Sequence, residues 1–268
     1  MQRIVSICPS NTELLTALDL TECLVGLDNY SDWPSTVQNL PRVGPDLNID
    51  MEKVKALKPD WVLASVSVPG MEKNIEALEQ EGIPYLVLYP DRIQGIPQDF
   101  IRVAERAGVA ERGHDLAHRF WLKLDEIKSK IPADQHVHRL YWEWWPKPVF
   151  TPGRDNWLTD VSEWVGGVNV FGEEKGQSVQ TDWAEVARRQ PDRVLAVWTG
   201  VPMNRVKKEK ILSRPPWQGK PFAQPDRIHI LEEGWYCRPS QRILTGIEYL
   251  AHLLYPDRFD PPDPDRPI

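Results

Sequence analysis

Short apolar runs alternate with stretches of helical periodicity along the first third of the chain. The apolar runs typical of buried strands are at residues 4–7, 24–27, 61–64 and 85–88. The stretches with helical spacing are at residues 10–18, 50–57 and 71–80. Ser10 and Glu13 have the spacing of a capping box, which predicts that Ser10 begins the first helix. Strands that alternate with helices predict a mostly parallel sheet covered on both faces.

The second half repeats this order. Strands are predicted at residues 139–142 and 228–231, and helices at residues 157–165 and 242–254. The clearest internal echo lies elsewhere. Residues 54–64 and residues 186–196 both read as a helix that stops before a Pro-Asp pair and is followed by a buried strand. We therefore infer two lobes built on similar plans.

A long helical stretch joins the two halves. It runs from about residue 97 to residue 131, with a weak point at Gly108, and its second part carries an apolar stripe. We expect an α/β fold of two Rossmann-like lobes, each with a mostly parallel sheet, bridged by one long helix. The expected division is an N-terminal lobe at residues 1–95, a helical linker at 96–135, a C-terminal lobe at 136–260 and a Pro-rich tail at 261–268.

Composition narrows the class of protein. The 268 residues are 41% hydrophobic and 26% charged, which is the globular range. A net charge of −7 without a basic stripe speaks against a nucleic-acid partner. No run approaches the ~20 apolar residues of a membrane span, so we expect no membrane insertion, and we expect a monomer.

Three cysteines, an odd and low number, fit a reducing compartment. If Met1 is the natural start, we expect a cytoplasmic protein. If a leader was removed, we expect an extracytoplasmic protein, in the periplasm or at the surface.

Aromatic residues gather after the predicted strands, where open parallel sheets bind ligands. The chain has twelve tryptophans, more than its seven tyrosines or six phenylalanines. An aromatic wall suits a ligand with broad apolar faces, which we expect in a cleft between the lobes. The residues expected to bind it are Tyr30, Trp33, Trp142, Glu143, Trp144, Trp145, Trp198, Trp235, Tyr236 and Arg238.

The segment at residues 141–145 shows how such a wall could form. An alternating strand puts Trp142 and Trp144 on one face and Tyr141, Glu143 and Trp145 on the other. One face is then expected in the core and the other in the cleft, with Glu143 accepting a hydrogen bond from the ligand. No Gly-rich phosphate loop, Gly-x-Ser-x-Gly elbow or His-Glu-x-x-His motif is present, so we expect no catalytic residues, no metal site and no enzyme activity.

Four segments of the chain resemble the vitamin B12-binding proteins of ABC importers, members of the iron-siderophore/cobalamin class of substrate-binding proteins. They are IVSICPSNTE at residues 4–13, YSDWP at 30–34, ALKPD at 56–60 and RPSQR at 238–242. The resemblance covers nearly the whole chain and implies the class III substrate-binding-protein fold. It also implies a cobalamin-like corrinoid as ligand and no cofactor of the protein's own. In this family Tyr30 would be the first-lobe aromatic contact, and Trp235 and Arg238 would meet the edge of the corrin.

The resemblance also implies an importer permease as partner, docked by one acidic residue on each lobe. Glu52 matches the first of these residues. Ala184 occupies the second position, and Glu185 follows one place later, where its side chain is turned by about 100° on a helix. The shift speaks against docking in the family's manner. Gly44 also stands near the place where the family carries a tryptophan.

Two alternatives stay open. A ferric siderophore or haem-type chelate would use converging cations: Arg238, helped by Arg92, Arg154 or Arg205. A corrinoid-handling enzyme or chaperone would use Cys8 and Cys237, because both follow predicted strands and thiolates bind soft metals.

Overall fold

The computed structural model describes residues 2–133 and 136–263. The chain forms two compact units, one of residues 2–90 and 94–121 and the other of residues 91–93 and 122–263. The division falls within helix α5 (Ala110–Lys130), inside the segment expected to link two lobes. Each unit has its own four-stranded parallel sheet, so the predicted two-lobed α/β fold is confirmed. Residues 264–268 of the predicted tail lie outside the described residues.

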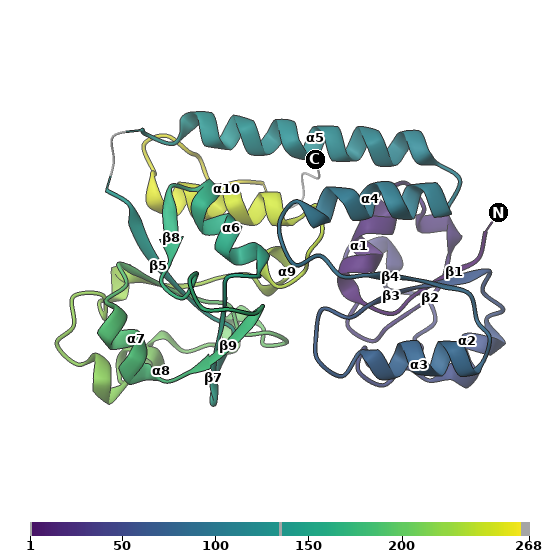
Figure 1. The fold of residues 1–268 in the computed structure, drawn as a ribbon, viewed down its shortest axis with the longest axis horizontal. Coiled ribbons are helices and arrows are strands. Elements are labelled where there is room, and N and C mark those ends of the chain that lie inside the picture. The colour runs from purple at the N-terminus through teal and green to yellow at the C-terminus, as the bar shows by residue number, and fades with distance from the viewer. Residues whose placement is uncertain (1, 134–135, 264–268) are drawn as a thin grey trace. The chain divides into compact units, whose positions relative to one another are not determined.

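The first unit is a parallel sheet covered on both faces, in the strand order β2-β1-β3-β4. Its strands are β1 (Ile4–Ser6), β2 (Leu24–Leu27), β3 (Trp61–Ser65) and β4 (Tyr85–Leu88). Its helices are α1 (Pro9–Ala17), α2 (Met51–Ala56), α3 (Glu72–Gln80) and α4 (Gly95–Arg106). Helices α1 and α4 lie on one face and α2 and α3 on the other (Figure 1). On the second face, Val62 packs with Val54 of α2 and Leu78 of α3.

The predicted capping box is wrong. Helix α1 begins at Pro9 with Cys8 as its N-cap, and Ser10 lies inside the helix, 3.3 Å from the Cys8 Sγ atom. Proline suits the first position of a helix because its φ angle is already helical and no N–H is lost from the ladder. The proline, which the sequence also shows, therefore sets the start of this helix.

The second unit has the strand order β11-β10-β5-β8, again all parallel. These strands are β5 (His138–Glu143), β8 (Gly167–Asn169), β10 (Arg193–Ala196) and β11 (Ile228–Ile230). The helices are α6 (Trp157–Trp164), α7 (Trp183–Arg189), α8 (Lys208–Leu212), α9 (Glu233–Tyr236) and α10 (Ile243–Leu254). Helices α6 and α10 cover one face, and α7 and α8 the other (Figure 1).

A small antiparallel sheet in this unit has no counterpart in the sequence analysis. It consists of β6 (Trp145–Pro146), β7 (Val149–Pro152) and β9 (Ser178–Thr181). Only one residue separates strand β6 from the end of β5, so this small sheet starts at the carboxyl end of a strand of the parallel sheet.

The two units share one topology. Counted along the chain, the parallel strands of each unit stand in the order second, first, third, fourth. The echo extends to single atoms. Asp60 accepts a hydrogen bond from the backbone N–H of Arg3 at 2.7 Å, and Asp192 accepts one from Arg139 at 2.8 Å. The repeat inferred from the two Pro-Asp turns is therefore a repeat of structure.

Helix α10 passes very close to helix α9 at Gly246. A Cβ atom at this position would lie 2.8 Å from the backbone oxygen of Trp235 and 3.0 Å from the ring of Tyr236. The Tyr236 hydroxyl donates a hydrogen bond to the Gly246 oxygen at 2.6 Å. Only glycine allows this approach, which fixes the position of α9.

Candidate functional site

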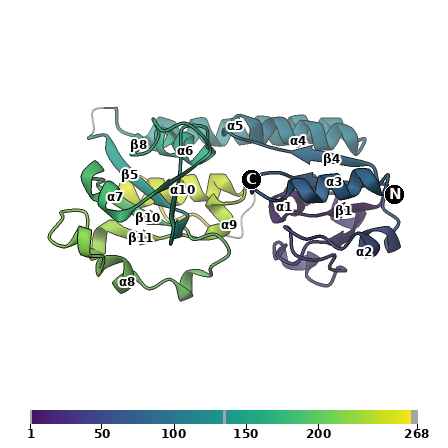
Figure 2. The ribbon, with the colours of Figure 1, turned by 60° about the horizontal axis from the view of Figure 1, so that its bottom comes forward.

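The carboxyl ends of three neighbouring strands form one edge of the second unit. Strands β5, β10 and β11 lie side by side and run parallel, so they end at the same edge (Figure 2). Trp144 and Trp145 follow β5, Trp198 follows β10, and Trp235 lies on α9 after β11. The aromatic residues predicted after separate strands are thus brought together at the edge where parallel sheets bind ligands.

Tyr141 and Trp142 are both fully buried in this unit. The Trp142 ring lies 5.3 Å from that of Tyr236, and its Nε1 donates to the Ser162 hydroxyl at 2.9 Å. Tyr141 packs on the other face of the sheet against Phe171. The expectation that one face of this strand is free for a ligand is wrong for residues 141–143, because helices cover both faces of the sheet.

The residues that follow the strands are more accessible. Trp145 is 41% exposed, and its Nε1 donates to the backbone oxygen of Lys147 at 3.0 Å. Trp144, Trp198 and Trp235 are half-buried, so each presents only part of its ring. Half-buried tryptophan is typical of binding surfaces because the ring is both apolar and able to donate a hydrogen bond.

Glu143 is the centre of a buried hydrogen-bond network. Arg214 reaches it with two guanidinium nitrogens, at 2.6 Å to each carboxylate oxygen. The Tyr141 hydroxyl donates to Oε2 at 2.8 Å, and the Trp198 indole donates to Oε1 at 3.0 Å. Burial and the nearby negative charge of Glu143 raise the pKa of the Tyr141 phenol well above its usual value. Protein donors therefore engage both oxygens of Glu143, which we had expected to receive a ligand donor.

Arg214 is not among the residues predicted from the sequence. Its guanidinium carbon lies 4.4 Å from the ring centroid of Trp217 and 4.6 Å from that of Trp183, and the side chain is only 3% exposed. A carboxylate among aromatic residues needs a cation when buried, so Glu143 signals that a partner exists. The sequence gives no sign that the partner is Arg214, 71 positions later.

Arg238 pairs with Glu233 at 3.1 Å, with 12% of the Arg238 side chain exposed. Its charge is thus compensated inside the second unit. Arg92, one of the arginines expected to help bind an anionic iron chelate, is also paired: it forms an ion pair with buried Asp160. Both observations weaken the siderophore alternative, because a paired cation attracts a ligand anion less strongly.

In the first unit, Tyr30 and Trp33 follow strand β2. Tyr30 is 55% exposed, and Trp33 is half-buried. Asp28 anchors this loop by accepting hydrogen bonds from the backbone N–H groups of Tyr30 at 2.7 Å and Ser31 at 3.0 Å. Burial raises the pKa of the Asp28 carboxyl to about 6.

The expected docking residues occupy unlike surroundings. Glu52 is 81% exposed and pairs with Lys55 at 2.6 Å. Hydrogen bonds from Arg188 and Arg189 hold Glu185 and lower its pKa to about 2. Helices α2 and α7 each start after an aspartate N-cap, and counting from that cap makes Ala184 the counterpart of Glu52.

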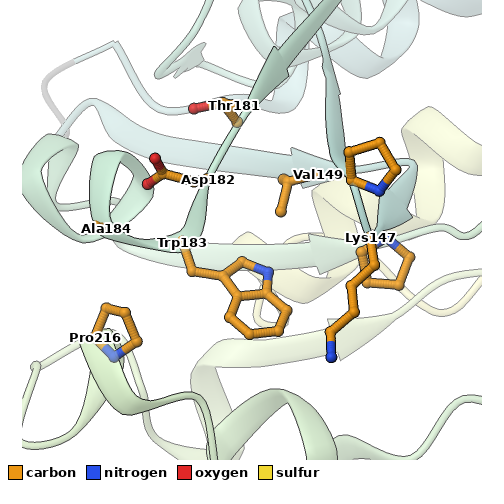
Figure 3. Close-up of a pocket in the computed structure, with 9 residues that line it drawn as sticks. Lys147, Val149, Thr181, Asp182, Trp183, Ala184 and Pro216 are labelled. Atoms are coloured by element: carbon orange, nitrogen blue, oxygen red, sulfur yellow. The ribbon is translucent and has the colours of Figure 1, made fainter.

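Ala184 lines a pocket of about 390 Å³ in the second unit (Figure 3). The pocket is largely apolar, with the Trp183 ring on one side and Lys147 at its rim. Its lining residues are Pro146, Lys147, Pro148, Val149, Thr181, Asp182, Trp183, Ala184 and Pro216.

The cysteines considered as metal ligands are protonated thiols. Burial raises the pKa of the Cys8 thiol to about 12 and also raises the pKa of the Cys237 thiol. Cys8 is the N-cap of α1, and the Cys237 thiol lies 3.6 Å from the Val197 oxygen. A metal-binding cysteine must be a thiolate, so both residues fit a packing role better.

Within residues 2–133 and 136–263, no three His, Cys, Asp or Glu side chains are grouped as a metal site. Over the same residues, none of the helices has the length and apolar character needed to cross a bilayer.

Comparison with known proteins places the chain among solute-binding proteins. It is 27% identical, over 96% of its length and 81% of the relative's, to an uncharacterised ABC transporter substrate-binding lipoprotein of Bacillus subtilis. The structure of the periplasmic vitamin B12-binding protein of Vibrio cholerae is 25% identical, with a TM-score of 0.78 over 94% of this chain and 96% of that one. A periplasmic haem-binding protein from Roseiflexus shares the fold, with a TM-score of 0.83 over 95% of this chain and 98% of that one, at 20% identity.

The model of the periplasmic binding protein family matches residues 4–233. This family binds solutes and is not enzymatic, so the corrinoid-handling enzyme considered above is set aside. The family model matches most of the chain, and the two parallel sheets agree with it. The chain therefore belongs to the periplasmic binding protein family.

Proposed function

We propose that the chain binds a cobalamin-like corrinoid, with Tyr30 of the first unit and Trp145, Trp198 and Trp235 of the second among its contacts. The observation that carries this proposal is an edge rich in aromatic rings and without histidine. The six histidines lie on helices, at or just before the start of β5, or within β11, and none follows the carboxyl end of a strand. A corrinoid brings its own ring nitrogens and base to the metal, so it needs broad apolar contact more than a side-chain ligand.

Haem is the second candidate, and exposed Tyr30 favours it. Protein-bound haem iron usually takes an axial side chain, and tyrosine is one of the residues that serve. Tyr30 is 55% exposed after strand β2, with its backbone N–H held by Asp28. A haem would therefore be ligated through the Tyr30 phenolate.

Titration of the purified protein with cyanocobalamin and, separately, with haemin tests the two ligands. We expect cyanocobalamin to quench tryptophan fluorescence, to shift its own visible spectrum and to stabilise the fold. At a hundredfold excess over the dissociation constant the free energy of unfolding should rise by about 2.7 kcal/mol. Haem would be established instead if the wild-type protein shifts the haemin spectrum, if Tyr30→Phe abolishes this shift, and if the wild-type protein does not respond to cyanocobalamin.

We also propose that the protein works outside the cytoplasm with an ABC importer. The support comes from the Bacillus subtilis relative, described as a substrate-binding lipoprotein of an ABC transporter, and from the periplasmic Vibrio cholerae protein. Glu52 is the more accessible of the two acidic residues expected to dock such a partner: its side chain is 81% exposed and has one lysine partner, whereas two arginines hold Glu185. Protease added to intact spheroplasts or cells should degrade the protein; protection from protease would place it in the cytoplasm.

A further inference from the structure

We propose that Glu143 and Arg214 form a positioning pair that holds the Trp198 indole in the orientation that meets the ligand. This inference rests on the proposed function for the identity of the ligand. Neither charged residue touches the ligand; both act through Trp198.

The geometry defines the direction of the Trp198 ring. Trp198 is the second residue after strand β10, and its Nε1 donates to the Glu143 Oε1 atom at 3.0 Å. The backbone N–H of Val197 donates to the Glu143 backbone oxygen at 3.0 Å, so the same residue fixes both the chain and the ring. An indole that is held at its nitrogen has one edge fixed. Part of the Trp198 ring packs against the core cluster that contains Tyr141, and only the exposed part of this half-buried ring is left for contact.

Arg214 in turn fixes the carboxylate. The guanidinium group donates to both Glu143 oxygens at 2.6 Å and packs against the rings of Trp183 and Trp217. A planar, two-pronged donor permits one orientation of the carboxylate, which a lysine ammonium would not enforce. The contacts thus form a chain: the rings of Trp183 and Trp217 hold the guanidinium group, which holds the carboxylate, which in turn holds the Trp198 indole.

The energetics favour a role beyond stability. Taking two charges out of water costs several kcal/mol per ion, and well-packed apolar residues are often as stable as a buried ion pair. Glu143 is 0% exposed and Arg214 3% exposed, so the pair bears this full cost. A fold that needed only stability could fill the same space with apolar side chains, whereas a fixed indole needs an acceptor at its nitrogen.

The test replaces the pair as a unit. The double variant Glu143→Leu with Arg214→Met keeps apolar volume and leaves no unpaired buried charge. We expect it to fold, to change the near-ultraviolet circular dichroism contributed by Trp198, and to bind cyanocobalamin about tenfold more weakly. The contribution of Trp198 is obtained by subtracting the spectrum of Trp198→Phe. Native binding and an unchanged Trp198 spectrum in the double variant would overturn the proposal.

Ser162→Ala is the matched control, because it removes the acceptor of a different indole, that of fully buried Trp142, which precedes Glu143 in β5 and points to the opposite face of the sheet. It should lose stability and keep affinity; an equal loss of affinity would show that only general packing matters. If the double variant does not fold, Arg214→Lys serves instead, with the same spectral change expected and an unchanged spectrum counting against the pair. Wild-type protein that binds neither cyanocobalamin nor haemin refutes the proposed function, while the ligand-free spectra still decide whether the pair positions Trp198.

Discussion

Asp60 in the first unit and Asp192 in the second are structural counterparts. Each follows a proline at the end of a helix, and each carboxylate accepts a hydrogen bond from the backbone N–H of an arginine that leads into the first strand of its sheet. The guanidinium group of Arg3 donates to the carbonyl of Leu57, the C-cap of helix α2, and that of Arg139 donates to the carbonyl of Arg189, the last residue of helix α7. The two units therefore have the same hydrogen bonds between the start of the first strand and the aspartate that precedes the third strand.

These matching hydrogen bonds predict similar losses of stability when either aspartate is replaced. Asp60→Ala and Asp192→Ala should each lower the free energy of unfolding by about 1 kcal/mol, because each leaves a backbone N–H without its acceptor. Urea denaturation measures this loss, with Glu76→Ala on the exposed side of α3 as the control. A change within ~0.3 kcal/mol for both aspartate variants would show that the shared geometry does not contribute to stability.

Stability should depend on pH through Asp28. Burial raises the pKa of this carboxyl to about 6 in the folded chain, against 3.8 as the usual value. The folded state thus holds the proton more tightly, so this contribution to stability is complete below about pH 4 and is lost as the pH rises to about 6. The loss is of the order of 2–3 kcal/mol.

Asp28→Asn should flatten the decline of unfolding free energy between about pH 4 and pH 6. Asp99, whose pKa burial also raises to about 6, contributes a separate part, so Asp99→Asn serves as the comparison and the double variant should be flattest. Denaturant titrations at several pH values measure these slopes. The same slope in Asp28→Asn as in wild type would contradict the assignment.

Trp235 should contribute strongly to ligand binding. Trp235→Ala is expected to weaken cyanocobalamin binding by about 2 kcal/mol or more, as for an aromatic residue central to an interface. Calorimetric titration measures the loss. Trp164→Ala is the control, because Trp164 ends helix α6 at the opposite end of the unit from the carboxyl ends of the strands. Equal affinities of wild type and Trp235→Ala would remove α9 from the site.

The thiols should react unequally with a chromogenic thiol reagent. Burial raises the pKa of the Cys8 thiol to about 12, so very little of the reactive thiolate is present at pH 8. Cys8 and Cys237 are expected to react only after the protein is denatured, leaving Cys23 as the one cysteine able to react in the native state. Rapid labelling of Cys8→Ser/Cys23→Ser protein would show that the Cys237 thiol is accessible.

The sequence predicted the parallel strands and most helices well because their signals are local. Apolar runs, Gly108 at the helix break and the Pro-Asp turns each act within a few residues. The capping box failed because Pro9 is a stronger start signal than Ser10. The small sheet of β6, β7 and β9 was not predicted because its strands are short and because β9 pairs with β7 from far along the chain, as in Phe150 with Gln180.

The candidate site was only partly predictable. Strand order brings Trp144, Trp198 and Trp235 to one edge, as a parallel sheet requires. The strand alternation at Trp142 misled, because a sheet covered on both faces buries both sets of side chains. The partner of Glu143 depends on tertiary packing and has no local signature. The placement of a ligand against these residues stays a prediction.

The missing side chain at Gly246 has a consequence for how this protein can change. A methyl group there would push against the oxygen of Trp235 and displace the short helix that carries this ring. The position of an aromatic residue at the ligand-facing edge is thus governed by a buried glycine eleven places further along the chain. Variation in ligand preference can arise at such a position without any substitution among the residues that face the ligand.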